Sequence, residues 1–151
     1  MVNCNFENYG CSGGLLVNTV DFLQTEGVTS EECMPYQDKD RSCSFTCSNG
    51  TKDYQKSKYF CKPGSLTILS SAEDIQTELF TKGPMMVGLT VYEDFTNYKS
   101  GVYKHVTGRA VGGHAIKLIG WGHNDGFTNV TDPATNTTTE VANDGGLYWI
   151  C

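Results

Sequence analysis

The stretch GGHAIKLIGWG, residues 112–122, carries the clearest structural signal in the chain. Its side chains alternate, so that His114, Ile116 and Leu118 fall on one face of an extended strand. The two glycines would let an approaching group reach the imidazole, and a histidine that opens a buried strand can be held rigidly. Such a position suits a general base near neutral pH, although the motif alone favours a structural role for His114, with its hydrogen bonds satisfied.

A second glycine-rich motif, GCSGG at residues 10–14, lies just before a predicted helix. Paired glycines allow another backbone to come close, because no Cβ stands in the way. A substrate peptide could bond its main chain to Gly14 as an added strand. A tight loop at the start of a helix explains the same residues without any ligand, so the motif alone leaves both interpretations open.

Composition limits the function classes. The chain has 151 residues, 38% of them hydrophobic, and no apolar run approaches the roughly 20 residues of a membrane span. The net charge of −6 argues against a basic nucleic-acid surface and a polybasic membrane anchor. Seven cysteines and three N-x-[ST] glycosylation acceptors, at Asn49, Asn129 and Asn136, favour an oxidising compartment. Such triplets also arise by chance in loops that are rich in Asn and Thr.

Hydrophobic periodicity predicts a helix over residues 13–25, stopped by Gly27. A second helix is predicted between Ser71, which forms a capping pattern with Asp74, and Gly83. Strands are predicted over residues 85–91, 102–106, 114–121 and 147–150. Residues 124–146 are predicted to be a long polar loop. Helices that come first and strands that come later predict the α+β class.

The polar stretch between Cys33 and Cys61 contains four cysteines and few apolar residues, so we expect it to need covalent ties. Zinc bound by Cys33, Cys43, Cys47 and Cys61 is one alternative, although their spacing lacks the C-x₂-C pairs of common zinc sites. A disulfide between Cys47 and Cys61 is another.

In this order, the motifs resemble the papain-like cysteine peptidases, and most of all their cathepsin B and cathepsin C branches. The resemblance extends over nearly the whole chain. It is carried by NC at 3–4, GCSGG at 10–14, MPY at 34–36 followed by Cys43, GPMMV at 83–87, YEDF at 92–95, YKSGVY at 98–103, GGHA at 112–115, GWG at 120–122 and YWI at 148–150.

The resemblance implies an incomplete papain-like two-domain fold. Residues 1–62 match part of the helical left domain, and residues 63–151 match most of the right domain, which resembles a β-barrel. The early cysteines and the strand-like end LYWIC also indicate a fragment of a longer protein.

The resemblance also implies a catalytic mechanism. In the family a cysteine thiolate attacks the peptide carbonyl, and a histidine oriented by an asparagine carries the proton. His114 matches that histidine, whereas His105 and His123 lie in polar contexts and are predicted to be surface residues. The C-G-[SA]-C-[WY] segment of the nucleophile and the NSWG segment of the asparagine do not occur in the chain. We therefore expect the chain alone to be inactive, and we do not expect Cys11 to replace the nucleophile.

Seven positions match substrate-binding residues of the family: Tyr9, Gly13, Gly14, Leu15, Gly88, Gly113 and Ala115. By resemblance, Gly13 and Gly14 hydrogen-bond the substrate backbone, and Tyr9 lies near the third subsite. The others line a roomy apolar pocket for the second residue before the scissile bond, although Leu15 also fits a helix core. The stretch Gly27–Met34 is too short for the occluding loop of cathepsin B, so the resemblance favours an endopeptidase.

The resemblance implies disulfides between Cys4 and Cys43 and between Cys33 and Cys47, and leaves Cys11, Cys61 and Cys151 over. It implies peptide or protein substrates and cystatin-like inhibitors as partners, with no nucleic acid, metal or cofactor. The parent protein is expected in a lysosome or vacuole or outside the cell, and this chain has no signal peptide. A catalytically dead relative that acts as a binding module, and a truncated gene product, are the alternatives.

Overall fold

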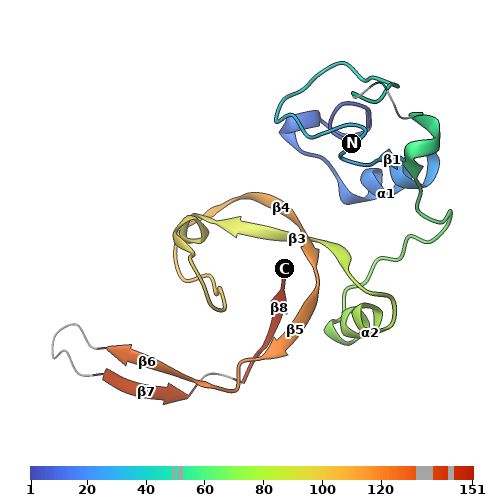
Figure 1. The fold of residues 1–151 in the computed structure, drawn as a ribbon. Helices are drawn as coiled ribbons and strands as arrows, with labels where there is room; N and C mark the ends of the chain where they lie inside the picture. The colour runs from blue at the N-terminus through green and yellow to red at the C-terminus, as the bar shows by residue number, and fades with distance from the viewer. Residues whose placement is uncertain (49, 51–52, 132–137, 143–144) are drawn as a thin grey trace. The chain divides into compact units, whose positions relative to one another are not determined.

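The computed structural model describes residues 1–48, 50, 53–131, 138–142 and 145–151, and over 127–131 and 138–142 it describes the backbone only. This part of the chain forms two compact units, Met1–Ile68 and Leu69–Cys151, and each is described by itself (Figure 1). Both contain a helix and strands, which confirms the α+β class. The division lies near the predicted boundary after residue 62. The assignment of residues 1–62 and 63–151 to the left and right domains stays a prediction.

The first unit is built around one helix. It contains η1 (Gly10–Ser12), α1 (Leu16–Thr25), β1 (Val28–Thr29), η2 (Gln55–Ser57) and β2 (Lys58–Tyr59), and β1 runs antiparallel to β2. Periodicity predicts the helix from residue 13, whereas it begins at Leu16. The difference arises because Leu15 is extended and its amide donates to Oδ1 of Asn8 at 2.8 Å.

Two disulfides tie the polar stretch of the first unit. Cys4 is bonded to Cys43 and Cys33 to Cys47, which are the pairs that the resemblance implies. Cys33 is fully buried and Cys47 is 6% exposed, so the second disulfide also fills the interior of this unit. Because Cys47 is bonded to Cys33, the alternative pairing with Cys61 and the four-thiolate zinc site are both excluded, and Cys61 is free.

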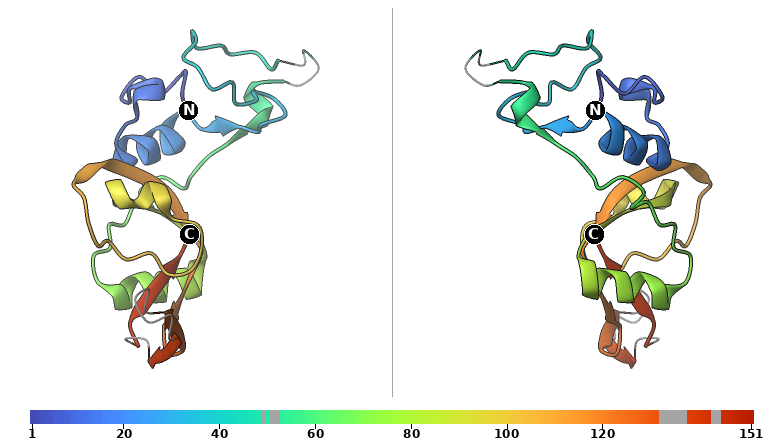
Figure 2. Two further views of the ribbon diagram at one scale, coloured as in Figure 1. Left: turned by 90° about the vertical axis from the view of Figure 1, so that its left-hand side faces the viewer. Right: turned by 90° about the vertical axis from the view of Figure 1, so that its right-hand side faces the viewer.

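The second unit contains a helix and antiparallel strand pairs. Its elements are α2 (Ala72–Lys82), β3 (Met85–Tyr92), η3 (Glu93–Asn97), β4 (Ala110–Leu118), β5 (Gly120–His123), β6 (Phe127–Thr131), β7 (Thr138–Ala142) and β8 (Leu147–Ile150). β3 pairs with β4, β5 with β8 and β6 with β7. α2 lies beside β5 (Figures 1 and 2). The predicted cap of α2 is confirmed, because Oγ of Ser71 accepts the amide of Asp74 at 3.1 Å.

β4 of the β3–β4 hairpin contains most of the GGHAIKLIGWG stretch, residues 112–122. His114 lies opposite Leu89, and Leu118 lies opposite Met85. Along β3 the odd-numbered residues from Met85 to Val91 are half-buried and Met86, Gly88 and Thr90 are exposed. His114 therefore shares the inner face with Leu118, which is 2% exposed, as the alternation predicts.

The prediction of a strand over residues 102–106 is wrong, because this segment has no regular secondary structure. The amides of Val106 and Thr107 donate instead to Oδ2 of Asp94, at 2.8 and 3.1 Å. A side-chain acceptor thus takes the place that a partner strand would have, and alternation of residue types along the segment cannot reveal it.

The prediction of a continuous loop over residues 124–146 is also wrong, because β6 and β7 form a hairpin there (Figure 1). Thr and Val occur in both strands, and Phe127 begins the first; these residues favour extended backbone, a preference that the Asn and Asp content of the segment obscured. The strand predicted over 114–121 begins earlier, at Ala110, and is interrupted at Ile119, whose amide donates to the carbonyl of Ile150.

Few apolar side chains are buried in the part of the chain that the structure describes. Leu79 and Leu118 are less than a tenth exposed, whereas Phe6, Phe80 and Val106 are more than four-fifths exposed. No helix among the described residues is both long and apolar enough to span a bilayer.

Candidate active site

His114 lies in the middle of β4 and its side chain is exposed. Backbone pairing on both sides holds it, with Gly113 opposite Thr90 and Ala115 opposite Gly88. Within the described residues its imidazole has no hydrogen-bond or ion-pair partner. Because the side chain is exposed, a reacting group can reach the imidazole.

The residues around His114 leave space beside it. Gly88 and Ala115 face each other across the hairpin and both are exposed. A Cβ added to Gly112 or Gly113 would meet no described atom within 4 Å. Close packing within the hairpin thus does not explain these two glycines.

The other predicted substrate-binding residues, Tyr9, Gly13, Gly14 and Leu15, lie together in one loop of the first unit. The amide of Tyr9 donates to the carbonyl of Gly13 at 2.9 Å, which closes the loop over η1. Tyr9 is 70% and Leu15 is 57% exposed, so the interpretation of Leu15 as helix core is not supported. The two groups of predicted residues therefore belong to separate units, and each unit brings its own group together.

Asparagines hold this loop, and the sequence interpretation did not single them out. Asn5, which is 4% exposed, donates to the carbonyl of Asn18 at 3.2 Å. Asn8 donates to Oγ1 of Thr19 and accepts the amide of Leu15. A Cβ on Gly14 would lie 2.3 Å from Cγ of Asn8, so a glycine is required for this close approach. The run NCNFEN before the motif was the available signal.

Cys11 lies in the same loop with an exposed, free thiol. Its amide donates to Oδ1 of Asp40 at 2.8 Å. Desolvation raises the pKa of the Cys11 thiol first, and the hydrogen bond and negative charge of Asp40, followed by the charge of Asp38, raise it further. A thiol that keeps its proton is a poor nucleophile, which fits the expectation that Cys11 does not perform catalysis.

His105 was predicted to be a simple surface residue, and the structure gives it two partners. Its ring stacks on Tyr92 with centroids 3.7 Å apart, and Nδ1 lies 3.2 Å from both oxygens of Asp94. The side chain is still 35% exposed. No local pattern in the sequence indicates these contacts, because Tyr92 and Asp94 lie more than ten residues away in the chain. His123 is exposed, as predicted.

Comparison with known proteins agrees with this arrangement. The family model described as "Papain family cysteine protease" matches residues 1–151, which is the whole chain. The chain belongs to the papain family of cysteine proteases. Its relatives within the papain family include Cathepsin B-like protease 1 of Arabidopsis thaliana, 38% identical over 130 residues, and Cathepsin B of Dictyostelium discoideum, 35% identical over 165 residues. These matches cover 78% and 99% of the chain.

A solved papain-family structure, proCathepsin B S9 from Trypanosoma congolense, superposes with a TM-score of 0.72 at 29% identity and covers 98% of this chain. The matches cover 46% of that structure, 34% of the Arabidopsis protein and 52% of the Dictyostelium protein. The chain therefore spans about a third to a half of the length of its relatives. These comparisons confirm the papain-like fold and a cathepsin B-like peptidase; none of those reported is a cathepsin C.

Two sets of predictions lie partly outside the structure. Among the glycosylation candidates, Asn49 and Asn136 lie outside the described residues, and only the backbone of Asn129, in β6, is described. Within the described part of this papain-family chain, no group of three or more His, Cys, Asp or Glu side chains is placed to hold a metal ion.

Proposed function

We propose that the whole protein of which this chain forms part is a papain-like cysteine endopeptidase, with His114 as its general base and acid. The observation that carries the proposal is the position of His114. The residues before and after it pair with β3, yet its imidazole is exposed and has space beside it. In this role the imidazole takes the proton of a cysteine thiol and later gives it to the leaving amine.

The substrates that we propose are peptides and proteins. An extended peptide would bond its main chain to Gly13 and Gly14 in the first unit. In the second unit, Gly88 and Ala115 would contact an apolar side chain of the substrate. The exposure of all these residues supports this role. Cystatin-like inhibitors would bind to the same residues. Two disulfides support a lysosomal, vacuolar or extracellular location, where such bonds persist.

The 151-residue chain alone is proposed to be inactive, because it contains no segment that matches the nucleophile. The experiment compares the chain with the full-length gene product on fluorogenic dipeptidyl substrates, on a long unfolded protein and with an epoxide cysteine probe. We expect internal cleavage and probe uptake by the full-length protein only. Absence of both would favour the binding module, and release of dipeptides alone would contradict the endopeptidase.

A further inference from the structure

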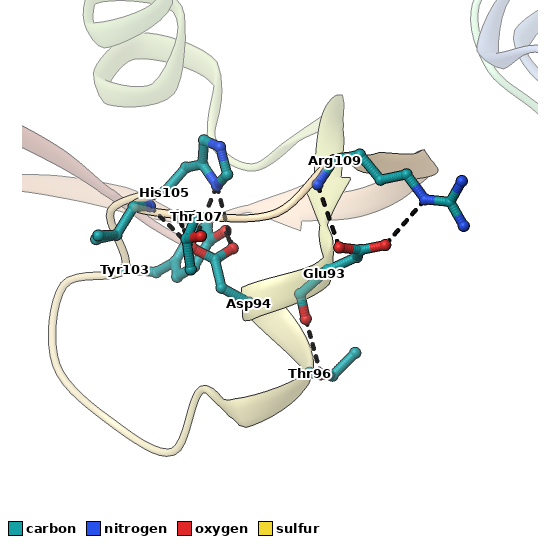
Figure 3. Close-up of polar contacts among 8 residues, drawn as sticks. Glu93, Asp94, Thr96, Tyr103, His105, Thr107 and Arg109 are labelled. Atoms are coloured by element: carbon teal, nitrogen blue, oxygen red, sulfur yellow. Dashed lines mark hydrogen bonds and ion pairs between the residues drawn. The ribbon is translucent and has the colours of Figure 1, made fainter.

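Asp94, in η3, binds the connection that leads into β4. Its Oδ1 accepts the hydroxyl of Tyr103 at 2.6 Å, and its Oδ2 accepts the amides of Val106 and Thr107 (Figure 3). His105 adds its Nδ1. The hydroxyl of Tyr103 first, and then the amide of Val106, hold the pKa of Asp94 well below its ordinary value. The carboxylate therefore stays charged and bound at acidic pH.

The neighbouring residue Glu93 binds the last residue before β4. Oε2 of Glu93 accepts the amide of Arg109 at 3.3 Å, Oε1 accepts Nε at 2.9 Å, and the amide of Glu93 donates to the carbonyl of Arg109 (Figure 3). Gly108 has a φ of +94°, and a Cβ there would lie 2.8 Å from Cβ of Glu93. We call Glu93 and Asp94 the acidic clamp. It fixes residues 103–109 and so fixes where β4 begins.

β4 is thus held at both ends, and its pairing register with β3 differs by one residue between the two ends. At one end Leu118 lies opposite Met85, and at the other Ala110 lies opposite Tyr92. This spacing is seven steps along β3 but eight along β4, so one residue is extra. The extra residue is Val111, at the irregularity next to Val91 and Tyr92.

A bulge of this kind bends its strand and increases the local twist, and bulges are common beside active sites, where they re-aim a side chain. Val111 precedes His114 by three residues, with only the two glycines between them. The first glycine pairs with Val91 and the second with Thr90, so a regular ladder joins the bulge to His114 and continues the strand direction that the bulge sets. The bend at Val111 is therefore close enough to change the direction of the His114 side chain.

We propose that Glu93 and Asp94 are positioning residues for His114, because the acidic clamp keeps Val111 in the strand as a bulge and the bulge sets the direction of the imidazole. Neither carboxylate touches the reacting atoms. The catalytic meaning of this direction rests on the proposed function, whereas the structural coupling does not.

The test uses the full-length gene product and two ways of removing the bulge. In Asp94→Asn, an NH₂ group replaces one carboxylate oxygen. The groups that now donate hydrogen bonds to that oxygen then face another donor, which releases the acidic clamp. Deletion of Val111 leaves the clamp intact and removes the extra residue. NMR reports cross-strand NOEs and the shift and titration midpoint of the His114 imidazole. Glu73→Gln, in α2, is the matched loss of one charge in the same unit.

Both changes should shift the His114 signals in the same direction. Asp94→Asn should replace the Tyr92–Ala110 NOEs by Tyr92–Val111 NOEs, and the double variant should show no larger shift than either single one. Such non-additivity indicates a shared element, which a general loss of stability would not produce. Glu73→Gln should leave the His114 signals unchanged.

The proposal is overturned if Asp94→Asn keeps the Tyr92–Ala110 pairing, if the two shifts add, or if all β3–β4 NOEs vanish, since the clamp would then support the whole hairpin. Gly108→Ala provides a second release of the clamp with both carboxylates retained, and the same result is expected. None of these readouts requires peptide cleavage. Failure here leaves the proposed function untouched, and an inactive full-length protein leaves the coupling untouched.

Discussion

Cys11 has an exposed thiol, and desolvation first and the neighbouring carboxylate of Asp40 second raise the pKa of this thiol. Asp40 both accepts the amide of Cys11 and raises the pKa of its thiol. Asp40→Asn keeps an oxygen for the amide and removes the charge. We expect alkylation of Cys11 by iodoacetamide at pH 7 to become severalfold faster, because more thiolate is present. Mass spectrometry of the labelled peptides measures the rate.

Asp53→Asn, in the same unit, is the control for this change and should leave the rate unchanged. The free thiols of Cys61 and Cys151 give internal references in every sample. An unchanged Cys11 rate in Asp40→Asn would contradict the assignment. So would specific labelling of wild-type Cys11 by an epoxide probe, because such labelling requires an activated thiolate.

At the scale of single residues, the sequence predicted the features that a local residue pattern encodes. The alternation around His114 placed it on the inner face of the hairpin, and the run of glycines indicated space beside it. Asn8 and Asp94 were not found, because each binds groups more than five residues away along the chain. Contacts of this kind depend on the fold, and a polar residue in a polar segment gives no sign of them.

The second helix depends on a capping residue that the sequence identified. Ser71 accepts the amide of Asp74, and its hydroxyl donates to Oδ2 of the same residue at 2.6 Å. Ser71→Ala removes both bonds and should lower the free energy of unfolding by about 1 kcal/mol. Urea denaturation measures the loss. Ser70→Ala, one residue before the cap, should cost far less, and equal effects would contradict the capping role.

The hydrogen bonds by which Asp94 holds the connection between β3 and β4 should persist at acidic pH. The ionisable groups around Asp94 are His105 and Tyr103, and burial, followed by the bond to Asp94, raises the pKa of Tyr103 to about 12. A carboxyl whose pKa is lowered on folding stabilises above its unfolded value and loses this effect as the pH falls toward its folded value. The stability difference between wild type and Asp94→Asn should therefore stay constant from pH 7 to about 5 and shrink progressively as the pH falls further, through the ordinary value of 3.8.

Urea midpoints of the full-length gene product between pH 7 and about 2 measure the difference, with Glu73→Gln as the control for loss of one charge. A difference that stays constant over this range, or that grows as the pH falls, would show that folding leaves the pKa of Asp94 at its ordinary value or raises it. That outcome would remove the argument that Asp94 stays charged at acidic pH.

Elements with strong local signals were predicted, and elements that depend on distant partners were not. The cap of α2 and the β-forming residues of β3 and β8 lie in the sequence itself. The segment over residues 102–106 has the residue types of a strand, yet a carboxylate takes its amides. The β6–β7 hairpin was missed for the opposite reason, because its polar composition is typical of a loop while its backbone pairs with itself.

The whole chain exposes more surface than a compact protein of its mass. Its accessible surface is 11085 Å², whereas about 7,600 Å² is expected for a compact monomer and about 9,100 Å² for two separate compact halves. Exposed side chains such as Phe6 and Phe80 contribute to the excess. Buried apolar area is the main source of stability. We therefore expect this chain to be less stable than a compact protein of the same length.

We therefore expect the isolated chain to unfold with weak cooperativity. A compact protein of 151 residues would absorb about 105 kcal/mol near 60 °C, at roughly 0.7 kcal/mol per residue. Differential scanning calorimetry should give a clearly smaller enthalpy for this chain. A sharp transition with the full enthalpy would contradict the prediction.

The central claim is that His114 is the general base of a cysteine peptidase. The most direct measurement is the rate at which the full-length gene product hydrolyses a fluorogenic dipeptidyl substrate, compared between wild type, His114→Gln and His123→Gln. General acid–base catalysis contributes about 10²–10⁴-fold, so we expect a loss of at least a hundredfold in His114→Gln and little change in His123→Gln. An active His114→Gln enzyme, with a rate within a few-fold of wild type, would contradict the claim.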